Sequence, residues 1–134
     1  MHSHFTDWKF TAPDCTALCA LHGALVVGAP RAVTDANRAT LAASLPSFAV
    51  ILSRGDTVIE RGVGSNVLGS PALALAYLSR LVAAQPQFPP IAAGEIITTG
   101  TLTDAKPVNP GETWSADYGA LGVDRLSLSF VETR

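Results

Sequence analysis

The sequence predicts an α+β domain in which mostly antiparallel, hairpin-linked strands are flanked by helices. Three observations support this fold class. Helical patterns cluster in the first two-thirds of the chain, β patterns dominate the last third, and two β-rich runs flank a Gly-Asp turn at residues 54–56. With 134 residues the chain has the size of one domain, so we expect a single domain over residues 1–134.

The N-terminal part alternates short helices with a short strand. Residues 1–12 indicate an irregular or strand-like entry. Asp14 is placed to cap a helix over residues 15–22, which Gly23 would end. The apolar run 24–27 precedes a Gly-Ala-Pro turn and is typical of a buried strand.

The middle of the chain predicts helix, hairpin and helix in turn. Ala and Leu residues at helical spacing follow Thr34, and Pro46 ends that helix. The hairpin strands cover 47–53 and 57–62. After a Gly-rich loop, a helix begins at Pro71, whose missing N–H costs nothing at a first helical position. This helix is apolar nearly all round to Gln85, so we expect it to be buried on most sides.

The last third predicts strands separated by Gly and Pro turns. No internal repeat or low-complexity stretch is evident. The expected strands are residues 95–99, 112–117 and 125–131.

Composition excludes several function classes. Hydrophobic residues make up 48% and charged residues 15%, which excludes charge-driven disorder. A net charge of -2 offers no basic excess for nucleic acid or a membrane surface. No apolar run reaches the ~20 residues that span a bilayer, and no signal peptide is evident, so we expect a cytoplasmic protein. The mean hydropathy of +0.30 favours an obligate oligomer with an extended buried interface.

Two cysteines, Cys15 and Cys19, would share one face of a helix in a geometry that suits a disulfide poorly. We expect two small core side chains. The alternative is a metal pair completed by His22, although structural zinc normally takes four ligands.

Short motifs in order along the chain carry a resemblance that covers roughly residues 7 to 131. They are Asp7-Trp8-Lys9, Asp14, Leu68-Gly69-Ser70-Pro71, Ala93-Gly94-Glu95, Thr99-Gly100-Thr101-Leu102-Thr103, Pro110-Gly111-Glu112 and Leu121-Gly122-Val123. In this order and spacing they resemble the C-terminal part of the fumarylacetoacetate hydrolase superfamily, in its 2-keto-4-pentenoate hydratase and 4-oxalocrotonate decarboxylase branch.

The resemblance implies a mixed β-roll with flanking helices, fumarylacetoacetase C-terminal-like and truncated at its N-terminus. It also implies lyase chemistry on a 2-hydroxy-2,4-dienoate or a related 2-oxo acid. The family uses Mg²⁺ or Mn²⁺, which chelates the substrate and stabilises enolate charge. Three glutamates hold that metal in the family: two in a Glu-x-Glu motif and one shortly before the Asp-Trp-Lys segment.

This chain departs from that pattern in two places. The Glu-x-Glu region is absent, and the sequence begins just after the place of the third glutamate. We therefore expect no metal site and no cofactor in this chain alone, with Mg or Mn only where a partner supplies carboxylates. In addition, the polar family segment Ala-Asp-Asn-Ala-Ser-Ser-Gly aligns with residues 17–23, where Leu, Cys and His replace polar groups.

Two residues are candidates for catalysis. Lys9 matches a family lysine that can offset carboxylate charge, and a surface lysine beside Trp8 is the alternative. His22 can act as acid or base near neutral pH, and a helix-end histidine that caps carbonyls or packs is the alternative.

Five residues are candidates for substrate binding. In the resemblance, the stretch Thr99, Gly100, Thr101 and Leu102 lines the pocket and hydrogen-bonds the substrate carboxylate, whereas an ordinary strand-to-turn transition is the alternative. Ser70 precedes a helix N-terminus, which attracts anions, and a simple helix cap is the alternative.

Three functions follow as hypotheses. The first is a hydratase- or decarboxylase-like lyase that is divergent and lacks its own metal ligands. The second is a non-catalytic partner subunit or binding protein with a degenerate pocket. The third is a metal-free lyase, isomerase or cyclase with a re-purposed pocket. The expected ligand is a small 2-oxo acid or an apolar molecule, and the expected assembly is a homo-oligomer or a heteromer with a family-related subunit.

Overall fold

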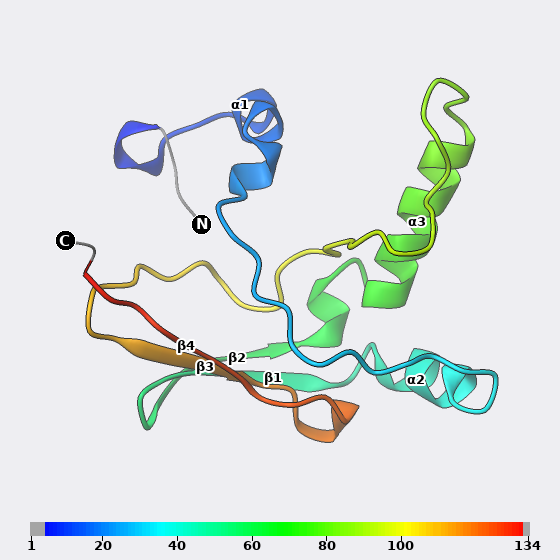
Figure 1. Cartoon of the computed structure of the whole chain (residues 1–134). Helices are drawn as coiled ribbons and strands as arrows, with labels where there is room; N and C mark the ends of the chain where they lie inside the picture. The colour runs from blue at the N-terminus through cyan, green and yellow to red at the C-terminus, as the bar shows by residue number, and fades with distance from the viewer. Residues whose placement is uncertain (1–4, 133–134) are drawn as a thin grey trace.

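A four-stranded antiparallel sheet forms the centre of the molecule (Figure 1). The structure, a computed structural model, describes residues 5–132. The strand order is β2-β1-β3-β4, so the last two strands of the chain extend the sheet from the free edge of β1. The elements in chain order are η1 (Thr6–Trp8), α1 (Ala12–Ala17), η2 (Cys19–Leu21), α2 (Arg38–Ser44), β1 (Ala49–Arg54), β2 (Thr57–Val63), η3 (Gly64–Asn66), α3 (Pro71–Ala83), β3 (Thr113–Asp117), η4 (Gly119–Leu121) and β4 (Leu126–Ser129).

The predicted mixture of helices with antiparallel strands is thus confirmed at the level of fold class. The hairpin at residues 54–56 is also confirmed, because β1 and β2 pair antiparallel around it, from Arg54 opposite Thr57 to Ala49 opposite Val63. The register shifts between Leu52 and Ser53, which marks a bulge in this hairpin.

The two faces of the sheet differ in chemistry. Pairing places Leu52 of β1 beside Ala116 of β3, and Ala116 beside Leu126 of β4, so an apolar face runs across three strands. One residue along, Ser53 pairs with Ser115, which pairs with Ser127, so the opposite face carries a row of hydroxyls. This alternation is the period of two expected of a half-covered antiparallel sheet.

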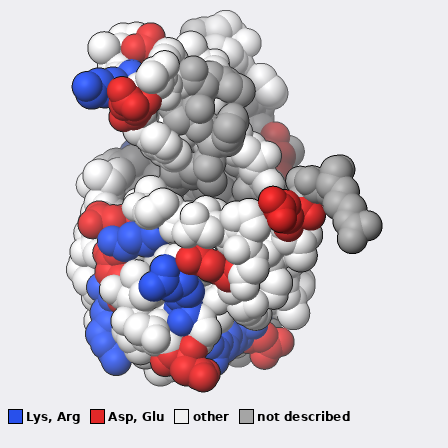
Figure 2. Space-filling view, turned by 90° about the vertical axis from the view of Figure 1, so that its left-hand side faces the viewer, with Lys and Arg blue, Asp and Glu red and all other residues white. Residues whose placement is uncertain are grey.

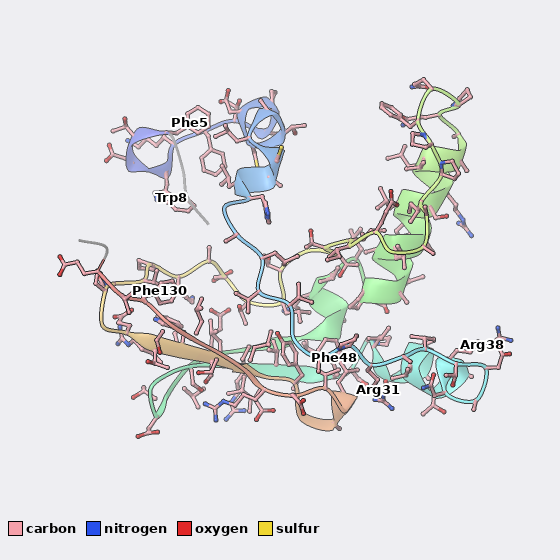
Figure 3. All side chains as sticks on the ribbon, in the orientation of Figure 1. Phe5, Trp8, Arg31, Arg38, Phe48 and Phe130 are labelled. Atoms are coloured by element: carbon pink, nitrogen blue, oxygen red, sulfur yellow. The ribbon has the colours of Figure 1, made fainter. Side chains whose placement is uncertain are left out.

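The helices α1, α2 and α3 do not cover the apolar face. The core in the described part of the chain is small, and its buried apolar side chains are Leu21, Phe48, Val50, Val67 and Trp114. Figure 1 shows α3 projecting away from the sheet. The N-terminal segment and α1 also lie above the sheet in this view. Figure 3 places Phe48 at the sheet, and Phe5 and Trp8 apart from it in the N-terminal segment.

Helix boundaries in the N-terminal part differ from the prediction. Asp14 does not precede the first helix but lies inside α1, where its carboxylate accepts hydrogen bonds from the N–H and hydroxyl of Thr11. This capping box moves the helix start to Ala12. The helix ends at Ala17 instead of reaching residue 22, because Cys19, Ala20 and Leu21 all adopt positive φ angles.

Two predicted strands are not formed. Residues 24–27 and 95–99 are both irregular, since neither stretch pairs with a strand of the sheet. Val27 is 64% exposed and Ile96 67% exposed, so neither apolar run is buried. Hydrophobic composition alone cannot distinguish a strand from an extended segment without a partner.

Two burial predictions are also wrong. No residue of α3 is buried, although its sequence is apolar nearly all round. Cys19 is exposed and Cys15 half-buried, and both are free thiols, so they are not a pair of core side chains. Local periodicity reports how much apolar surface a helix offers, and only the surrounding structure determines how much is covered.

The expectation that no stretch is long and apolar enough for a bilayer is contradicted by residues 64–83. Eighteen consecutive residues of this stretch have a mean hydropathy of 1.2, and 11% of them are buried. The evidence for a membrane span is weak, because core helices of soluble proteins meet the same criterion. Leu68 and Gly69 adopt left-handed conformations before α3 begins. Regular helix therefore spans about 20 Å, short of the ~30 Å hydrocarbon core.

Candidate functional site

The candidate site is a cavity of about 300 Å³ between the apolar face of the sheet and residues 99–106, which we call the strap. We call this space the strap cavity. Its floor comes from β1 and β3, and its wall comes from the strap and the turn after β3. The lining residues are Val50, Leu52, Gly100, Thr101, Leu102, Thr103, Asp104, Ala105, Ala116 and Tyr118.

Contacts with β2 and the turn after it hold the strap in place. The side-chain Nδ2 of Asn66 donates a hydrogen bond to the backbone carbonyl oxygen of Leu102 at 2.9 Å. The backbone N–H of Asp104 donates to the Glu60 carboxylate at 3.0 Å. Gly62 allows this approach, because a Cβ at this position would overlap the backbone carbonyl of Leu102.

An ion pair fixes the far end of the strap. The Lys106 ammonium lies 2.5 Å from one Glu60 carboxylate oxygen and 3.8 Å from the Asp104 carboxylate. Hydrogen bonds from Lys106 and from the Asp104 N–H hold the pKa of Glu60 below its ordinary value. The same hydrogen bond to Glu60 raises the pKa of Lys106. Glu60 and Lys106 therefore stay ionised and paired at neutral pH.

The wall of the cavity carries hydrogen-bond donors above an apolar floor. In the described part of the chain, the backbone N–H groups from Gly100 to Thr103 have no hydrogen-bond partner. The hydroxyls of Thr101, Thr103 and Tyr118 belong to lining residues as well. Burial raises the pKa of Tyr118, so its phenol stays protonated at neutral pH and is able to donate. This arrangement suits a carboxylate with a short carbon chain.

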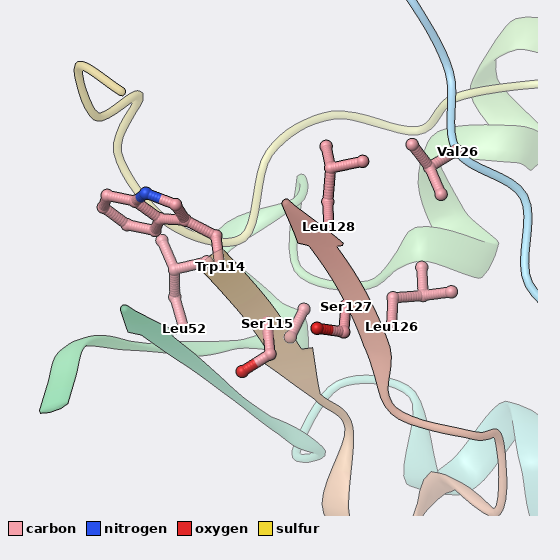
Figure 4. Close-up of a pocket in the computed structure, with 8 residues that line it drawn as sticks. Val26, Leu52, Trp114, Ser115, Leu126, Ser127 and Leu128 are labelled. Atoms are coloured by element: carbon pink, nitrogen blue, oxygen red, sulfur yellow. The ribbon is translucent and has the colours of Figure 1, made fainter. Parts of the chain in front are cut away.

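A second cavity, which we call the apolar cavity, adjoins the first on the same face of the sheet (Figure 4). It has a volume of about 150 Å³ and shares Leu52 and Ala116 with the strap cavity. Figure 4 shows Val26 from the N-terminal segment above Leu126 and Leu128 of β4. The two cavities therefore form one continuous surface that is polar at the strap and apolar towards β4.

Three of the predicted substrate-binding residues lie together in the strap cavity, namely Gly100, Thr101 and Leu102. Thr99 precedes them on the strap and does not line the cavity. Ser70 is buried at the start of α3, where its hydroxyl accepts a hydrogen bond from the N–H of Ala72 at 3.3 Å. The alternative of a helix cap therefore describes its contacts in the structure.

The two predicted catalytic residues lie elsewhere. Lys9 follows η1 and His22 follows η2, both are exposed, and neither lines either cavity. Figure 3 shows Trp8, next to Lys9, in the N-terminal segment away from the sheet. A catalytic role for Lys9 or His22 remains a prediction.

Sequence reasoning missed the floor of the cavity and one polar group in it. Val50 and Leu52 were expected only as members of a strand. Tyr118 follows β3, and its place beside the strap depends on the pairing of β3 with β1. The alternation of apolar residues in β1 could have indicated which side chains face the same way. No signal in the sequence indicated which strand would lie next to β1.

The described residues do not fit the divalent metal that the resemblance implies. They contain no group of three or more His, Cys, Asp or Glu side chains placed to hold an ion. The carboxylates nearest the strap cavity, Glu60 and Asp104, are both in ion pairs with Lys106.

The charged surface does not favour nucleic acid on the face seen in Figure 2. Basic and acidic side chains are interspersed there and not separated by sign. A protein that binds the phosphate backbone needs a continuous basic surface.

Comparison with known proteins gives a consistent set of relatives, although no protein-family model matches the sequence. The chain is 32% identical to a 4-oxalocrotonate decarboxylase of Pseudomonas sp. over 132 residues, which is 98% of this chain and 46% of the relative. It is 32% identical to the 2-hydroxyhexa-2,4-dienoate hydratase of Comamonas testosteroni over 130 residues, or 97% of this chain and 46% of that hydratase. The chain thus spans less than half the length of these relatives.

A solved structure supports the same relationship. The 4-oxalocrotonate decarboxylase from Pseudomonas putida G7, complexed with magnesium and adipate, superposes with a TM-score of 0.58 at 34% sequence identity. The superposition covers 66% of this chain and 32% of that one. Sequence and structure comparisons therefore agree on the branch that the motifs indicated.

Proposed function

We propose that the chain contributes to lyase chemistry on a 2-hydroxy-2,4-dienoate or a related 2-oxo acid. The proposal is based on its relation, over the part that it spans, to the hydratase and decarboxylase branch of the fumarylacetoacetate hydrolase superfamily. One observation carries this proposal. The motif residues Gly100, Thr101 and Leu102, chosen from sequence, line a cavity whose floor is apolar. The relationship also supports a fumarylacetoacetase C-terminal-like β-roll as the architecture from which this sheet derives.

The strap cavity suggests how a 2-oxo acid binds. Its carboxylate accepts hydrogen bonds from backbone N–H groups of the strap and from the Thr101 hydroxyl. The carbon chain then lies on Leu52 and Ala116, whose side chains exclude water. Tyr118, kept protonated because burial raises its pKa, donates to an oxygen on the opposite side. The protein thus binds and orients the ligand with donors that are neutral and already in place.

Charge balance at the site depends on Lys106. Asp104 is a lining residue and brings a negative charge near an anionic ligand, but Lys106 lies 3.8 Å from its carboxylate. When a divalent metal takes part, it supplies Lewis-acid stabilisation of developing negative charge. We propose that Mg²⁺ or Mn²⁺ joins this site only when a second polypeptide supplies the carboxylates. A cytoplasmic location remains an expectation of this proposal.

A binding function without catalysis is the second candidate. It is favoured by the ion pair between Glu60 and Lys106, which holds the pKa of Glu60 below its ordinary value and keeps this carboxylate engaged. On this reading the chain holds a 2-oxo acid, or an apolar molecule in the apolar cavity, for a catalytic subunit.

The experiment that separates the candidates measures binding and turnover on the same purified chain. Adipate and a 2-hydroxy-2,4-dienoate are titrated with and without Mg²⁺, while consumption of the dienoate is followed by its absorbance. Lyase function predicts saturable binding and turnover, alone or with a second subunit. Binding without turnover, both by the chain alone and after addition of a second polypeptide that supplies the carboxylates, would leave the binding function. Absence of binding to either ligand would refute both.

A further inference from the structure

The molecule exposes far more surface than a compact protein of its mass. Its accessible surface is 9870 Å², whereas a folded monomer of 13.9 kDa exposes about 6,700 Å² by the usual scaling with mass. The excess of roughly 3,200 Å² is larger than the ~1,000–2,500 Å² that each partner contributes to an obligate interface, and far larger than what a transient contact covers. A surface of this extent is therefore suited to a partner of domain size.

Part of the exposed surface is apolar and lies on α3. Its apolar residues fall on one broad arc of the helix, and Leu73, Tyr77 and Leu81 are each about half exposed. Ala76 and Ser79 mark the narrow opposite side. A helix with such a wide apolar face is normally buried on most of its surface. Here none of its residues is buried, and Figure 1 shows it standing free of the sheet.

A second exposed apolar stretch lies on the same side of the sheet as α3 (Figure 1). It consists of the extended segment 25–33, in which Leu25, Val26, Val27 and Val33 are 46% to 70% exposed. Val26 also borders the apolar cavity, so this stretch continues onto the sheet face. Together, α3, segment 25–33 and the apolar cavity make up what we call the docking face.

The relatives indicate what covers the docking face. In them the region homologous to this chain is 46% of a single polypeptide. A folded protein of that full length exposes roughly 12,000 Å², so half of it has an average share near 6,000 Å². The accessible surface of this chain, 9870 Å², is much larger than that share. The difference is an area that the remaining part of such a relative would cover.

We propose that the docking face binds a polypeptide homologous to the portion of these decarboxylases and hydratases that this chain does not span. The face is mainly apolar, with Arg31 and Arg80 as its charged residues, as in interfaces that form together with folding. This inference rests on the family relationship and the exposed area, and it does not require the proposed lyase activity. The occupant is a complementary family half and not a second copy of this chain.

The test compares the chain by itself with a chimera. In the chimera, this chain replaces the matched region of the Pseudomonas sp. 4-oxalocrotonate decarboxylase. Hydrogen exchange of the α3 amides is measured in both, and light scattering gives the mass of the chain alone. We expect a monomer whose α3 amides exchange nearly freely. In the chimera, the same amides should exchange at least about 100-fold more slowly.

Matched variants locate the contact. In the chimera, L73K together with L81K should restore fast exchange in α3 and lower the unfolding midpoint. The control pair A76K and S79K lies on the opposite side of the helix and should leave both unchanged. If the chimera does not fold, the unmatched portion of the relative is co-expressed with this chain as a separate polypeptide, and the same exchange is measured in the complex.

Three results would overturn the proposal. One is a stable dimer of this chain alone with protected α3 amides, which would make a second copy the occupant. Another is unprotected α3 in both the chimera and the co-expressed pair. The third is an equal response to the two variant pairs. Adipate titration of the same samples reports separately on the strap cavity, so loss of ligand binding with intact α3 protection would count against the lyase proposal alone.

Discussion

The indole N–H of Trp114 donates a hydrogen bond to the Glu112 carboxylate at 2.9 Å, which joins the first buried side chain of β3 to the turn before it. The other contacts of Glu112 belong to the same turn. Its carboxylate also accepts from the backbone and side-chain nitrogens of Asn109. The Arg54 guanidinium pairs with it at 3.1 Å and lies over the Trp114 ring. The turn and both central strands thus depend on one carboxylate.

The lowered pKa of Glu112 predicts that the fold loses stability in acid. Hydrogen bonds from Trp114 and Asn109, with a smaller contribution from Arg54, lower the pKa of Glu112 from 4.5 to about 2. Because the folded pKa lies below the unfolded one, its contribution is complete above about pH 4.5 and is lost as pH falls towards 2. E112Q should therefore flatten the pH dependence of urea unfolding across that range. E132Q, which changes an exposed glutamate, should not, and an unchanged slope in E112Q would contradict the assignment.

A substitution at Gly62 tests whether the strap lies against β2. A methyl group at this position would meet the Leu102 carbonyl, so G62A should displace the strap or destabilise the fold by roughly 1–3 kcal/mol. Urea unfolding measures the loss of stability, and hydrogen exchange at residue 104 reports on the position of the strap. R61A, a neighbouring exposed position, is the control and should change neither. Wild-type stability and exchange in G62A would show that the strap does not lie against β2.

The hydroxyl of Tyr118 predicts a contribution to binding but not to folding. In the described part of the chain it has no hydrogen-bond partner, so Y118F should leave the unfolding midpoint nearly unchanged. If the phenol donates to a bound 2-oxo acid, the same variant should weaken binding about three- to tenfold. Y77F changes an exposed tyrosine on α3 and is the control. Equal affinity in Y118F and wild type would remove Tyr118 from the binding site.

Features of the fold and of the site that depend on contacts between neighbours in the chain could be predicted from the sequence. Features that depend on contacts between distant residues could not. The hairpin at 54–56 and the helix start at Pro71 depend on neighbours in the chain, and both were predicted. Residues 24–27 and 95–99 are as apolar as true strands but lack partners, which local pattern cannot reveal. Tyr118 was missed for the same reason, since its site exists only once β3 pairs with β1. Gly100, Thr101 and Leu102 were found through the family motif, not through periodicity.

A variant at Ser70 distinguishes between a helix-capping role and a substrate-binding role of this residue. Its hydroxyl accepts a hydrogen bond from the Ala72 N–H at the start of α3, so S70A should cost about 1 kcal/mol of stability. Ligand affinity of the folded protein should stay the same, because Ser70 does not line the strap cavity. S79A, in an exposed turn of the same helix, is the control for stability. A loss of affinity in S70A without a loss of stability would support the substrate-binding role that the sequence suggested.

The last prediction separates the hydrogen bond of Glu60 from its charge. The Asp104 N–H donates to one carboxylate oxygen, and Lys106 pairs with the other. E60Q keeps an acceptor oxygen but loses the charge, whereas E60L loses both. If the hydrogen bond holds the strap, exchange of the Asp104 amide should rise by roughly tenfold in E60L and much less in E60Q. K106M keeps the acceptor and removes only the ion pair, so it should behave like E60Q. Equal acceleration in all three variants would instead assign the position of the strap to the ion pair, and no acceleration in any of them would assign it to Asn66 and Gly62.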